Sequence, residues 1–573
     1  MSIRRRDFII GSLGVAATAN LLPGCGDDDG AKSPGNLDGG TGLDGGVGTD
    51  GGLGMDAGVF DAVTFAHGVG SADPLAGAVI IWTRVSGQTQ PLAVSWTFAK
   101  DAALKDVVQT GTVQAVPSSD FTVQVDVTGL SAGTTYYYAF SISATSRSIT
   151  GRTRTLPSTL DHARLAFTSC ANWQNGYFSA YRAIAKRNDL DVWIHLGDYI
   201  YEYGSGVYAD PTLAQARAHV PANEAITLTD YRTRYAQYRS DPDLQELHRQ
   251  HPLIVVWDDH EFANNAWTGG AEDHNPGEGD WNARKAAAIQ AFREWLPLRV
   301  IEASPTPKIF RSFPFGDLFD LIMLDTRMYA RDKQTGDTDA LGDVGNDAGV
   351  WADPNRHIIG AEQESWLFGQ LDQSVQRGAR WRLIGNQVVF SQGKNPLDTM
   401  MVPHGIIYSD FWDDYQADRN ALIQHIATNG VHNVVFLTGD IHSTWVMEVS
   451  TNPFDPAVYN PSQGLNGVAI ELVGPAVTSL ALEDNPGNAQ LAPTLLKQDN
   501  PHLLFSEFTR KGYVLLDITP ERLQAEWWYV KQFKLPNDAE QELGKAYTCQ
   551  QNTARLIETT TVTPPKDAPA AAV

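Results

Sequence analysis

Residues 191–202 have the sequence DVWIHLGDYIYE, in which an apolar run leads directly into a cluster of carboxylate and tyrosine side chains. Four further segments have the same form: LAFTSC at 165–170, LIVVWDDHE at 253–261, LIMLDTR at 321–327 and VVFLTGDIH at 434–442. An apolar run bounded by polar residues is typical of a strand buried on both faces of its sheet. Open α/β sheets bind their ligands at the carboxyl ends of the strands. The pattern therefore predicts a layered α/β domain whose chemistry lies at one edge of the sheet.

The composition limits the classes of partner. The chain has 573 residues, 42% of them hydrophobic, and a formal net charge of −24. This length predicts two or more domains. Proteins bind nucleic acid mainly through Lys and Arg contacts to phosphates, so we expect no specific nucleic-acid binding from so acidic a chain. A small phosphate ester is compatible with the acidity, because bound cations can reverse the local field.

Residues 1–25 have the form of an export signal of the twin-arginine and lipoprotein type. Arg4, Arg5 and Arg6 precede an apolar stretch that is short and rich in Gly and Ala for a membrane span. The sequence LPGC at 22–25 is similar to a lipobox, in which Cys25 carries the lipid. Residues 26–58 are rich in Gly and Asp and predict a flexible tether. We expect a periplasmic or cell-surface protein that touches the membrane only through this anchor; the alternative is a secreted protein cleaved nearby.

Residues 59–157 predict a small all-β domain, ahead of a larger domain at 158–546 in which strands and helices alternate. The short alternating runs of the first domain lie at 78–85, 92–99, 121–130 and 134–144. The segment DVTGLSAGTTYYYAF resembles part of a fibronectin type III-like sandwich. We interpret His67 and Asp73, which precede these runs, as turn and strand-pairing residues instead of metal ligands, because no other polar residues cluster with them.

The larger domain contains five expected helices, at 178–188, 230–249, 281–298, 361–377 and 415–429. Gly430 follows the last of them at the position of a helix C-cap. Strand-like sequence returns at 500–530, which we expect to pair with the same domain. Residues 333–353 predict a long loop, and residues 547–573 predict a C-terminal tail.

The residues after the apolar runs are of the types that bind metal ions. Asp198 and Tyr201 form a G-D-x-x-Y pattern, in which the carboxylate can bridge two cations and the phenolate can bind a ferric ion. Asp259 and His260 end a buried run, where uncompensated carboxylates would be costly. The sequence GDIH places Asp440 two residues before a histidine, and a carboxylate in that position favours calcium over zinc.

Cys170 has two interpretations. A lone cysteine is usually a small buried hydrophobe. At the end of a strand that carries metal-ligand residues, its thiolate would instead be a strong ligand for ferric iron, and we favour this second interpretation. The chain has 3 Cys in all, so no disulfide framework is expected.

Two further strand ends carry residues suited to a phosphate. Arg327 can hold phosphate oxygens bidentately, which Lys would do less well. A salt bridge between Arg327 and the neighbouring Asp325 is an equally good interpretation. Asn386 follows another apolar run and is a candidate for placing the substrate or water.

Together, Cys170, GDYIYE, WDDHE, LDTR, GNQ and GDIH resemble, in order and spacing, the PhoD-type alkaline phosphatases and phosphodiesterases of the calcineurin-like metallophosphoesterase superfamily. The resemblance covers about residues 60–530. It implies a calcineurin-like αββα sandwich catalytic domain, preceded by the small all-β fibronectin type III-like domain. It also implies one ferric ion, Fe(III), and calcium as cofactors.

The resemblance further implies a role for each site residue. Iron would be bound by Cys170, Asp198, Tyr201 and His442. Calcium would be bound by Asp198, Asp259 and Asp440, with Asn264 or Asn265 placing a second calcium. Arg327 would bind the phosphate, and His260 would lie near the phosphate and assist the leaving group.

The expected function is an exported, metal-dependent phosphohydrolase that cleaves phosphomonoesters and phosphodiesters at alkaline pH. One alternative is a nucleotidase or lipid phosphodiesterase on the same scaffold, which a panel of monoesters and diesters would distinguish. The other is a non-enzymatic surface lipoprotein that adheres through its β domain. That alternative predicts missing ligand residues, and the main ligand residues are present in the sequence.

Overall fold

The computed structural model describes residues 64–300, 306–335, 348–394, 410–482 and 486–572. The predicted export signal, Cys25 and the tether lie outside the described residues, as does most of the predicted loop at 333–353. Within the described part of the chain, we find no helix with the length and apolar character that crossing a membrane requires.

Two large sheets carry the five apolar runs. In the ten-stranded sheet the three central neighbours run parallel: β8 (Ala163–Thr168), β9 (Val192–His195) and β10 (Leu253–Val255). In the seven-stranded sheet the matching parallel neighbours are β12 (Phe319–Met323), β13 (Trp381–Gly385) and β14 (Val434–Thr438). The remaining strands of the seven-stranded sheet are β11 (Arg311–Phe315), β15 (Thr444–Val449), β16 (Ala469–Val473) and β17 (Leu503–Glu507).

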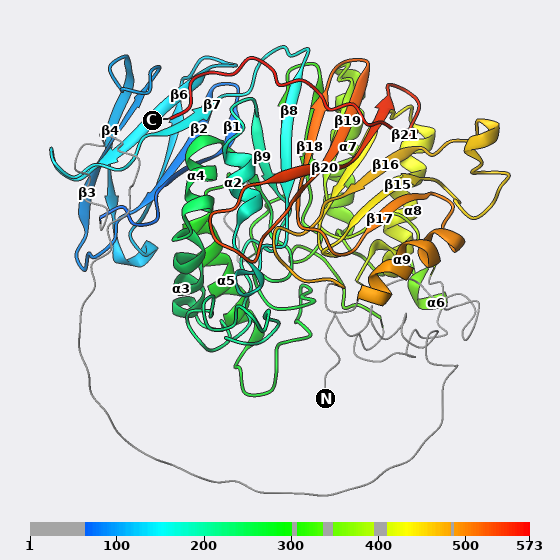
Figure 1. Ribbon diagram of the computed structural model, residues 1–573, viewed down its shortest axis with the longest axis horizontal. Helices are drawn as coiled ribbons and strands as arrows, with labels where there is room; N and C mark the ends of the chain where they lie inside the picture. Colours follow the sequence, from blue (N-terminus) through cyan, green and yellow to red (C-terminus); the bar gives the residue numbers. More distant parts are fainter. Residues whose placement is uncertain (1–63, 301–305, 336–347, 395–409, 483–485, 573) are drawn as a thin grey trace, which may run out of the picture.

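The two sheets pack face to face, and helices cover their outer faces (Figure 1). Leu321 and Met323 of β12 lie in the same core as Leu165 of β8, whereas the alternate residue Ile322 packs with the outer helices. This alternation explains why the strands are apolar on both faces. The helices on the seven-stranded side are α7 (Gly360–Gln376) and α8 (Gln416–Thr428). Those on the other side are α2 (Ser179–Ala185), α3 (Leu228–Arg239), α4 (Pro242–Gln250) and α5 (Trp281–Trp295). The predicted αββα arrangement is confirmed.

The N-terminal β domain shares a sheet with the larger domain. Its strands β1 (Val69–Leu75), β2 (Ala78–Arg84) and β5 (Thr122–Thr128) continue the ten-stranded sheet, since Ala72 of β1 pairs in parallel with Leu253 of β10. Its second sheet contains β3 (Leu92–Ala99), β4 (Val107–Ala115), β6 (Thr135–Ser141) and β7 (Gly151–Arg154). Asp73 pairs with Arg311 at 2.8 Å and joins the two domains. Asp73 thus has a structural role, but as an ion-pair residue at an irregularity of β1 and not as the turn or strand-pairing residue that we expected.

The helices differ from the prediction at three places. The predicted helix at 230–249 is two helices, α3 and α4, because Asp241 caps α4 and Pro242 occupies its first turn, where a proline cannot continue the preceding helix. Gly430 adopts a positive φ of 67° after α8, as its C-cap position predicts. The short α6 (Ala348–Trp351) and α9 (Pro486–Asp499) have no counterpart in the prediction.

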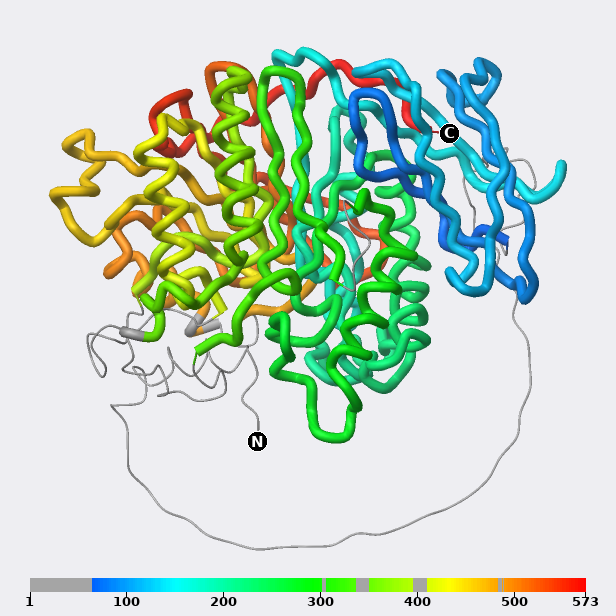
Figure 2. The backbone as a smooth tube through the Cα atoms, turned by 180° about the vertical axis from the view of Figure 1, so that it is seen from behind, coloured from blue at the N-terminus to red at the C-terminus, as the bar shows by residue number. Residues whose placement is uncertain are grey.

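The C-terminal segment is more ordered than the predicted tail. Strands β18 (Gly512–Ile518), β19 (Arg522–Val530), β20 (Gln541–Gln550) and β21 (Leu556–Glu558) extend the ten-stranded sheet on the side away from the N-terminal domain. The chain then returns across the molecule to the N-terminal domain, as Figure 2 shows. Arg164 donates to the Pro564 carbonyl at 3.0 Å, and Arg152 donates to that of Pro569 at 3.2 Å. The prediction of a tail from residue 547 is therefore wrong for residues 547–550 and 556–558, which pair as strands at the sheet edge.

Candidate functional site

The carboxyl ends of the parallel strands of both sheets meet at one place. Cys170 follows β8, Asp198 follows β9, and Asp440 and His442 follow β14. All four residues have φ between 55° and 66°, in the left-handed region that residues other than glycine rarely adopt. Such strain persists where the surrounding fold holds it, and it clusters at functional sites. Gly197 has a φ of 110°, and a side chain there would collide with Asp258, so this glycine lets the loops after β9 and β10 approach each other.

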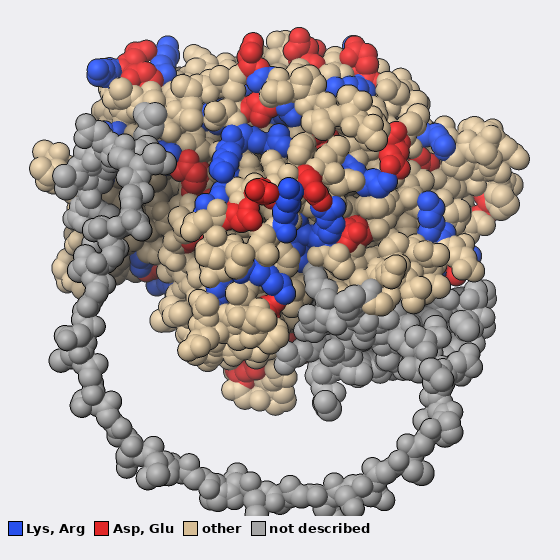
Figure 3. Space-filling model, in the orientation of Figure 1, with Lys and Arg blue, Asp and Glu red and all other residues tan. Residues whose placement is uncertain are grey.

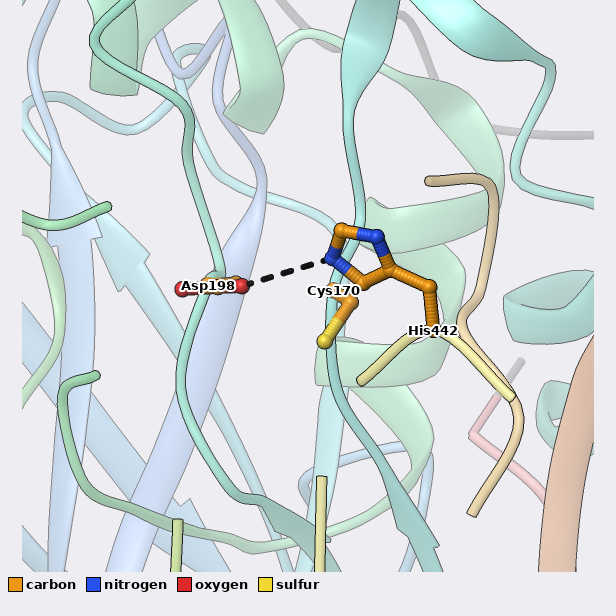
Figure 4. A group of neighbouring side chains, drawn as sticks. All are labelled: Cys170, Asp198 and His442. Atoms are coloured by element: carbon orange, nitrogen blue, oxygen red, sulfur yellow. Dashed lines mark ion pairs between the residues drawn. The ribbon is translucent and has the colours of Figure 1, made fainter. Parts of the chain in front are cut away.

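The first group of potential metal ligands contains Cys170, Asp198 and His442. One ligand atom from each lies within 4.8 Å of the others, and all three side chains are buried (Figure 4). His442 Nε2 lies 3.9 Å from Asp198 Oδ2. The Tyr201 hydroxyl lies 2.9 Å from Asp198 Oδ2 and 3.0 Å from His442 Nε2. The structure thus brings together the four residues that the resemblance implied for iron.

The chemistry of this group fits a cation. Burial, and after it the charge of Asp198, raises the pKa of the Cys170 thiol well above its usual value. The same two causes raise the pKa of Tyr201. Neither side chain would ionise here without a positive ion beside it. A thiolate, a phenolate, an imidazole and a carboxylate form a donor set suited to a transition metal such as ferric iron.

The second and third groups are rich in carboxylates and share residues with the first. Asp198, Asp259 and His260 form one, and Asp258, Asp259 and Asp440 form the other. Asp258 Oδ2 is buried and has no hydrogen-bond partner among the described residues. Burial raises the pKa of Asp258, and the neighbouring Asp259 and Asp440 raise it further. Hard oxygen donors gathered in this way fit calcium. Asp258 is missing from our predicted ligand set, although it stands next to Asp259 in the same WDDHE run.

Arg327 lies at the border of the third group, and carboxylates occupy most of its donors. Its Nε donates to Asp258, its Nη1 to Asp410 at 2.8 Å, and its Nη2 to Asp410 at 2.7 Å and Asp440 at 3.1 Å. A guanidinium has five N–H donors, so one remains in this arrangement. The predicted bidentate grip on phosphate is therefore not available to Arg327 as it lies here. The alternative salt bridge to Asp325 is also absent, because Asp325 accepts the backbone N–H of Arg327 instead, at 3.0 Å.

His260 is held by a carboxylate that the sequence analysis missed. Its Nδ1 lies 2.8 Å from Glu202 Oε2, and its ring stacks on Tyr201 with 4.1 Å between ring centres. Burial lowers the pKa of His260, but Glu202, Asp259 and Asp198 together raise it to about 10. Glu202 is the last residue of GDYIYE, so its place after a strand was the available signal. The contact fixes Nδ1 and leaves Nε2 as the ring atom that can exchange a proton with a substrate.

Glu261 and Tyr208 support the potential metal ligands from behind. Glu261 accepts the backbone N–H groups of Asp198 at 3.0 Å, Tyr199 at 2.5 Å and Asp258 at 2.8 Å, and so fixes the loops after β9 and β10 together. The Tyr208 hydroxyl lies 2.8 Å from His442 Nδ1. Neither residue was predicted, because each acts through a partner that is distant in the sequence.

The three predicted asparagines differ in what they contact: Asn264 and Asn265 lie beside the cluster, and Asn386 does not. The Asn265 backbone N–H donates to Asp259 Oδ2 at 2.6 Å, and that of Asn264 donates to Glu202 Oε1 at 2.6 Å. Asn264 Oδ1 is buried and has no hydrogen-bond partner among the described residues, as suits a position beside a cation. Asn386 is used inside the fold, where its Oδ1 accepts the Trp412 indole N–H at 3.0 Å and its Nδ2 donates to the Val388 carbonyl. The structure does not support the prediction that Asn386 places the substrate.

Charges on the surface are interspersed. On the face drawn in Figure 3, Lys and Arg side chains lie beside Asp and Glu side chains. Lys531 and Glu540 form one exposed pair, at 3.2 Å. Water and salt screen exposed pairs of this kind. The buried charges at the strand ends therefore dominate the field that a substrate meets there.

Comparisons with known proteins agree with this geometry. Residues 165–527 match the family model for PhoD-like phosphatase, and residues 55–157 match the model for the N-terminal domain of PhoD-like phosphatase. The curated protein Alkaline phosphatase D of Bacillus subtilis (strain 168) is 36% identical over 484 residues, which cover 82% of this chain and 78% of that protein. A solved structure described as Structure of PhoD has a TM-score of 0.76 and 32% identity, and the match covers 88% of this chain and 94% of that one.

Proposed function

This chain belongs to the PhoD-like phosphatase family and is a phosphoric ester hydrolase, and we propose that it cleaves both phosphomonoesters and phosphodiesters at alkaline pH. One observation carries the proposal: the three groups of potential metal ligands form one buried cluster that shares Asp198 and Asp259. A cluster of this kind suits a reaction in which negative charge develops on phosphoryl oxygens.

We propose Fe(III) for the group of Cys170, Asp198, Tyr201 and His442, and calcium for Asp198, Asp259 and Asp440, so that Asp198 would belong to both sites. The thiol and the phenol support iron. The group of Asp258, Asp259 and Asp440 offers only carboxylate oxygens, which supports calcium. When bound, the cations would supply Lewis-acid stabilisation of the phosphoryl oxygens and activate water. Asn264 Oδ1 is a further candidate for a second calcium.

The chain's own residues would then position and move protons. Glu202 holds Nδ1 of His260, so the proton on Nε2 is the one that His260 can give to a leaving alkoxide. Glu261 keeps the loops that carry Asp198 and Asp258 at a fixed separation through its three accepted N–H groups. Arg327 contributes positive charge at the border of the cluster, most of it already compensated by Asp258, Asp410 and Asp440.

We expect aryl phosphodiesters to be hydrolysed with a kcat/KM equal to or greater than that for aryl phosphomonoesters. A monoester dianion needs more compensating charge than a diester monoanion, and the protein cations at this site are Arg327 and His260, both already paired with carboxylates. The measurement compares the two esters at alkaline pH with calcium present. Activity on monoesters alone would refute the charge argument and leave the assignment to the family intact.

We also propose that the chain is exported by the twin-arginine route and anchored through Cys25. The Arg4–Arg6 run, the apolar stretch and the LPGC sequence support this, although all lie outside the described residues. In Cys25→Ala the protein is expected to leave the membrane fraction, and in a double Arg5→Lys, Arg6→Lys variant precursor is expected to stay in the cytoplasm. An unchanged membrane fraction for Cys25→Ala would place the anchor elsewhere.

A further inference from the structure

We propose that Asp410 is a positioning residue that sets the preference of the site between phosphodiesters and phosphomonoesters. It holds the Arg327 guanidinium in place and compensates its charge, and so disfavours a substrate that brings two negative charges. The proposal rests on the phosphohydrolase function above and adds a determinant of its specificity.

Asp410 is the centre of a buried network between the loop after β12 and the segment before α8. Its side chain is fully buried, as are those of Arg327 and Arg331. Both of its oxygens accept from Arg327, at 2.8 and 2.7 Å, in the fork geometry that fixes a guanidinium most firmly. Arg331 Nη2 and Gln334 Nε2 each donate to Oδ1 at 2.7 Å. Asp410 therefore fixes where the charge of Arg327 lies.

The network borders the cluster of carboxylates. Arg327 Nη2 lies 3.1 Å from Asp440 Oδ1 and 3.8 Å from Asp259 Oδ1. Gln334 also donates to the Asn265 carbonyl at 3.2 Å, and the Asn265 N–H binds Asp259. Asp410 is thus connected to the third group by two routes without belonging to any of the groups of potential ligands.

The charges give the direction of the effect. Arg327 and Arg331 bring two positive charges to the network, and Asp410 is the carboxylate that both of them bind. A neutral residue at position 410 would leave one more unit of positive charge next to the cluster. Because the site is buried, that charge is poorly screened, and a dianion gains about twice as much from it as a monoanion. Loss of the Asp410 charge should therefore favour monoesters.

The same segment offers a matched control. Asp414 is fully buried, and it binds the Thr335 N–H at 2.7 Å and Arg356 at 2.8 Å, so it braces neighbouring loops and not Arg327. Asp410→Asn and Asp414→Asn remove the same charge four residues apart. A general loss of order in this segment would affect both variants alike, whereas a change in specificity should appear in Asp410→Asn.

The experiment measures kcat and KM for one aryl monoester and its aryl diester at about pH 9, well above the second phosphate pKa of about 6, so that the monoester is a dianion. In Asp410→Asn, the ratio of monoester to diester kcat/KM is expected to rise about tenfold, chiefly through a lower KM for the monoester. Asp414→Asn should keep the ratio of the unmodified protein. Asp410→Glu, which keeps the charge, should keep the low ratio too.

Arg331→Gln gives the opposite sign and decides the matter if Asp410→Asn does not fold. It removes a positive charge that Asp410 partly compensates, so more of the Asp410 charge would act on Arg327. The ratio of monoester to diester kcat/KM should therefore fall. Equal losses of kcat/KM for both esters in Asp410→Asn would overturn the proposal and leave Asp410 as a structural brace. A shift of the monoester-to-diester ratio in the same direction in Asp410→Asn and Arg331→Gln would overturn it too. Failure of the proposed function is a separate outcome, because the unmodified protein would then hydrolyse neither ester.

Discussion

Cys170→Ser is expected to lower iron content and turnover together, by on the order of 100-fold or more, because loss of a residue that only supports a metal ligand already costs about 10–100-fold. The Cys170 sulfur lies within 4.8 Å of ligand atoms of Asp198 and His442, and burial holds its thiol protonated unless a cation is present. A serine hydroxyl is a much weaker ligand for ferric iron than a thiolate. The measurements are iron per chain, kcat on an aryl phosphate, and the visible charge-transfer absorption band that thiolate and phenolate ligands give with ferric iron.

Cys549→Ser is the matched control. Cys549 is also buried, but it lies in β20 with its sulfur 3.7 Å from the Thr553 hydroxyl, far from the strand ends that carry the cluster. Its replacement should cost about 1–3 kcal/mol of stability by burying a hydroxyl, with iron and kcat unchanged. Tyr201→Phe should alter the visible band while Cys170 remains. Full iron content in folded Cys170→Ser would mean that Cys170 is simply a core residue.

Most residues of the cluster could be predicted because their signal is local. Asp198, Asp440 and His442 each follow an apolar run within a few residues, and parallel strands bring such positions to one edge. The alternation of Leu321, Ile322 and Met323 between two cores could not be predicted, because every residue of the run is apolar. The run shows burial on both faces but not which layer covers each face.

The residues that were missed act through partners that are distant in sequence. Glu202 is 58 positions from His260, and Asp410 is 83 positions from Arg327. Such pairs depend on how loops from both sheets meet, which no window of sequence contains. For the same reason β20 and β21 were not predicted, because their pairing at a sheet edge has little periodic signature. The parallel pairing of β1 with β10 across the two domains was not predicted either. Arg327 is a further case, since its residue type suits a phosphate while its neighbours in space are carboxylates.

Removal of calcium is expected to abolish hydrolysis, and added calcium to restore it. Asp258, Asp259 and Asp440 are buried within 4.8 Å of one another, and Arg327 is already shared among Asp258, Asp410 and Asp440. Carboxylates held this close repel one another, so the fold itself should be less stable without the ion. Calcium at 100 times its dissociation constant should add about 2.7 kcal/mol of stability. A calcium-selective chelator, followed by calcium titration, measures both the rate and the melting temperature.

Two aspartate variants separate calcium binding from general stability. Asp259→Asn should lose the calcium-dependent rise in melting temperature and need far more calcium for activity, since it removes a ligand shared by two of the groups. Asp241→Asn removes another buried aspartate, one that caps α4 by accepting the Asp243 N–H at 2.9 Å. It should lower the melting temperature by the same amount at every calcium concentration and keep the full rise in melting temperature that calcium causes. Unchanged activity after chelation, or full activity with zinc in place of calcium, would show that the carboxylate group has been assigned the wrong ion.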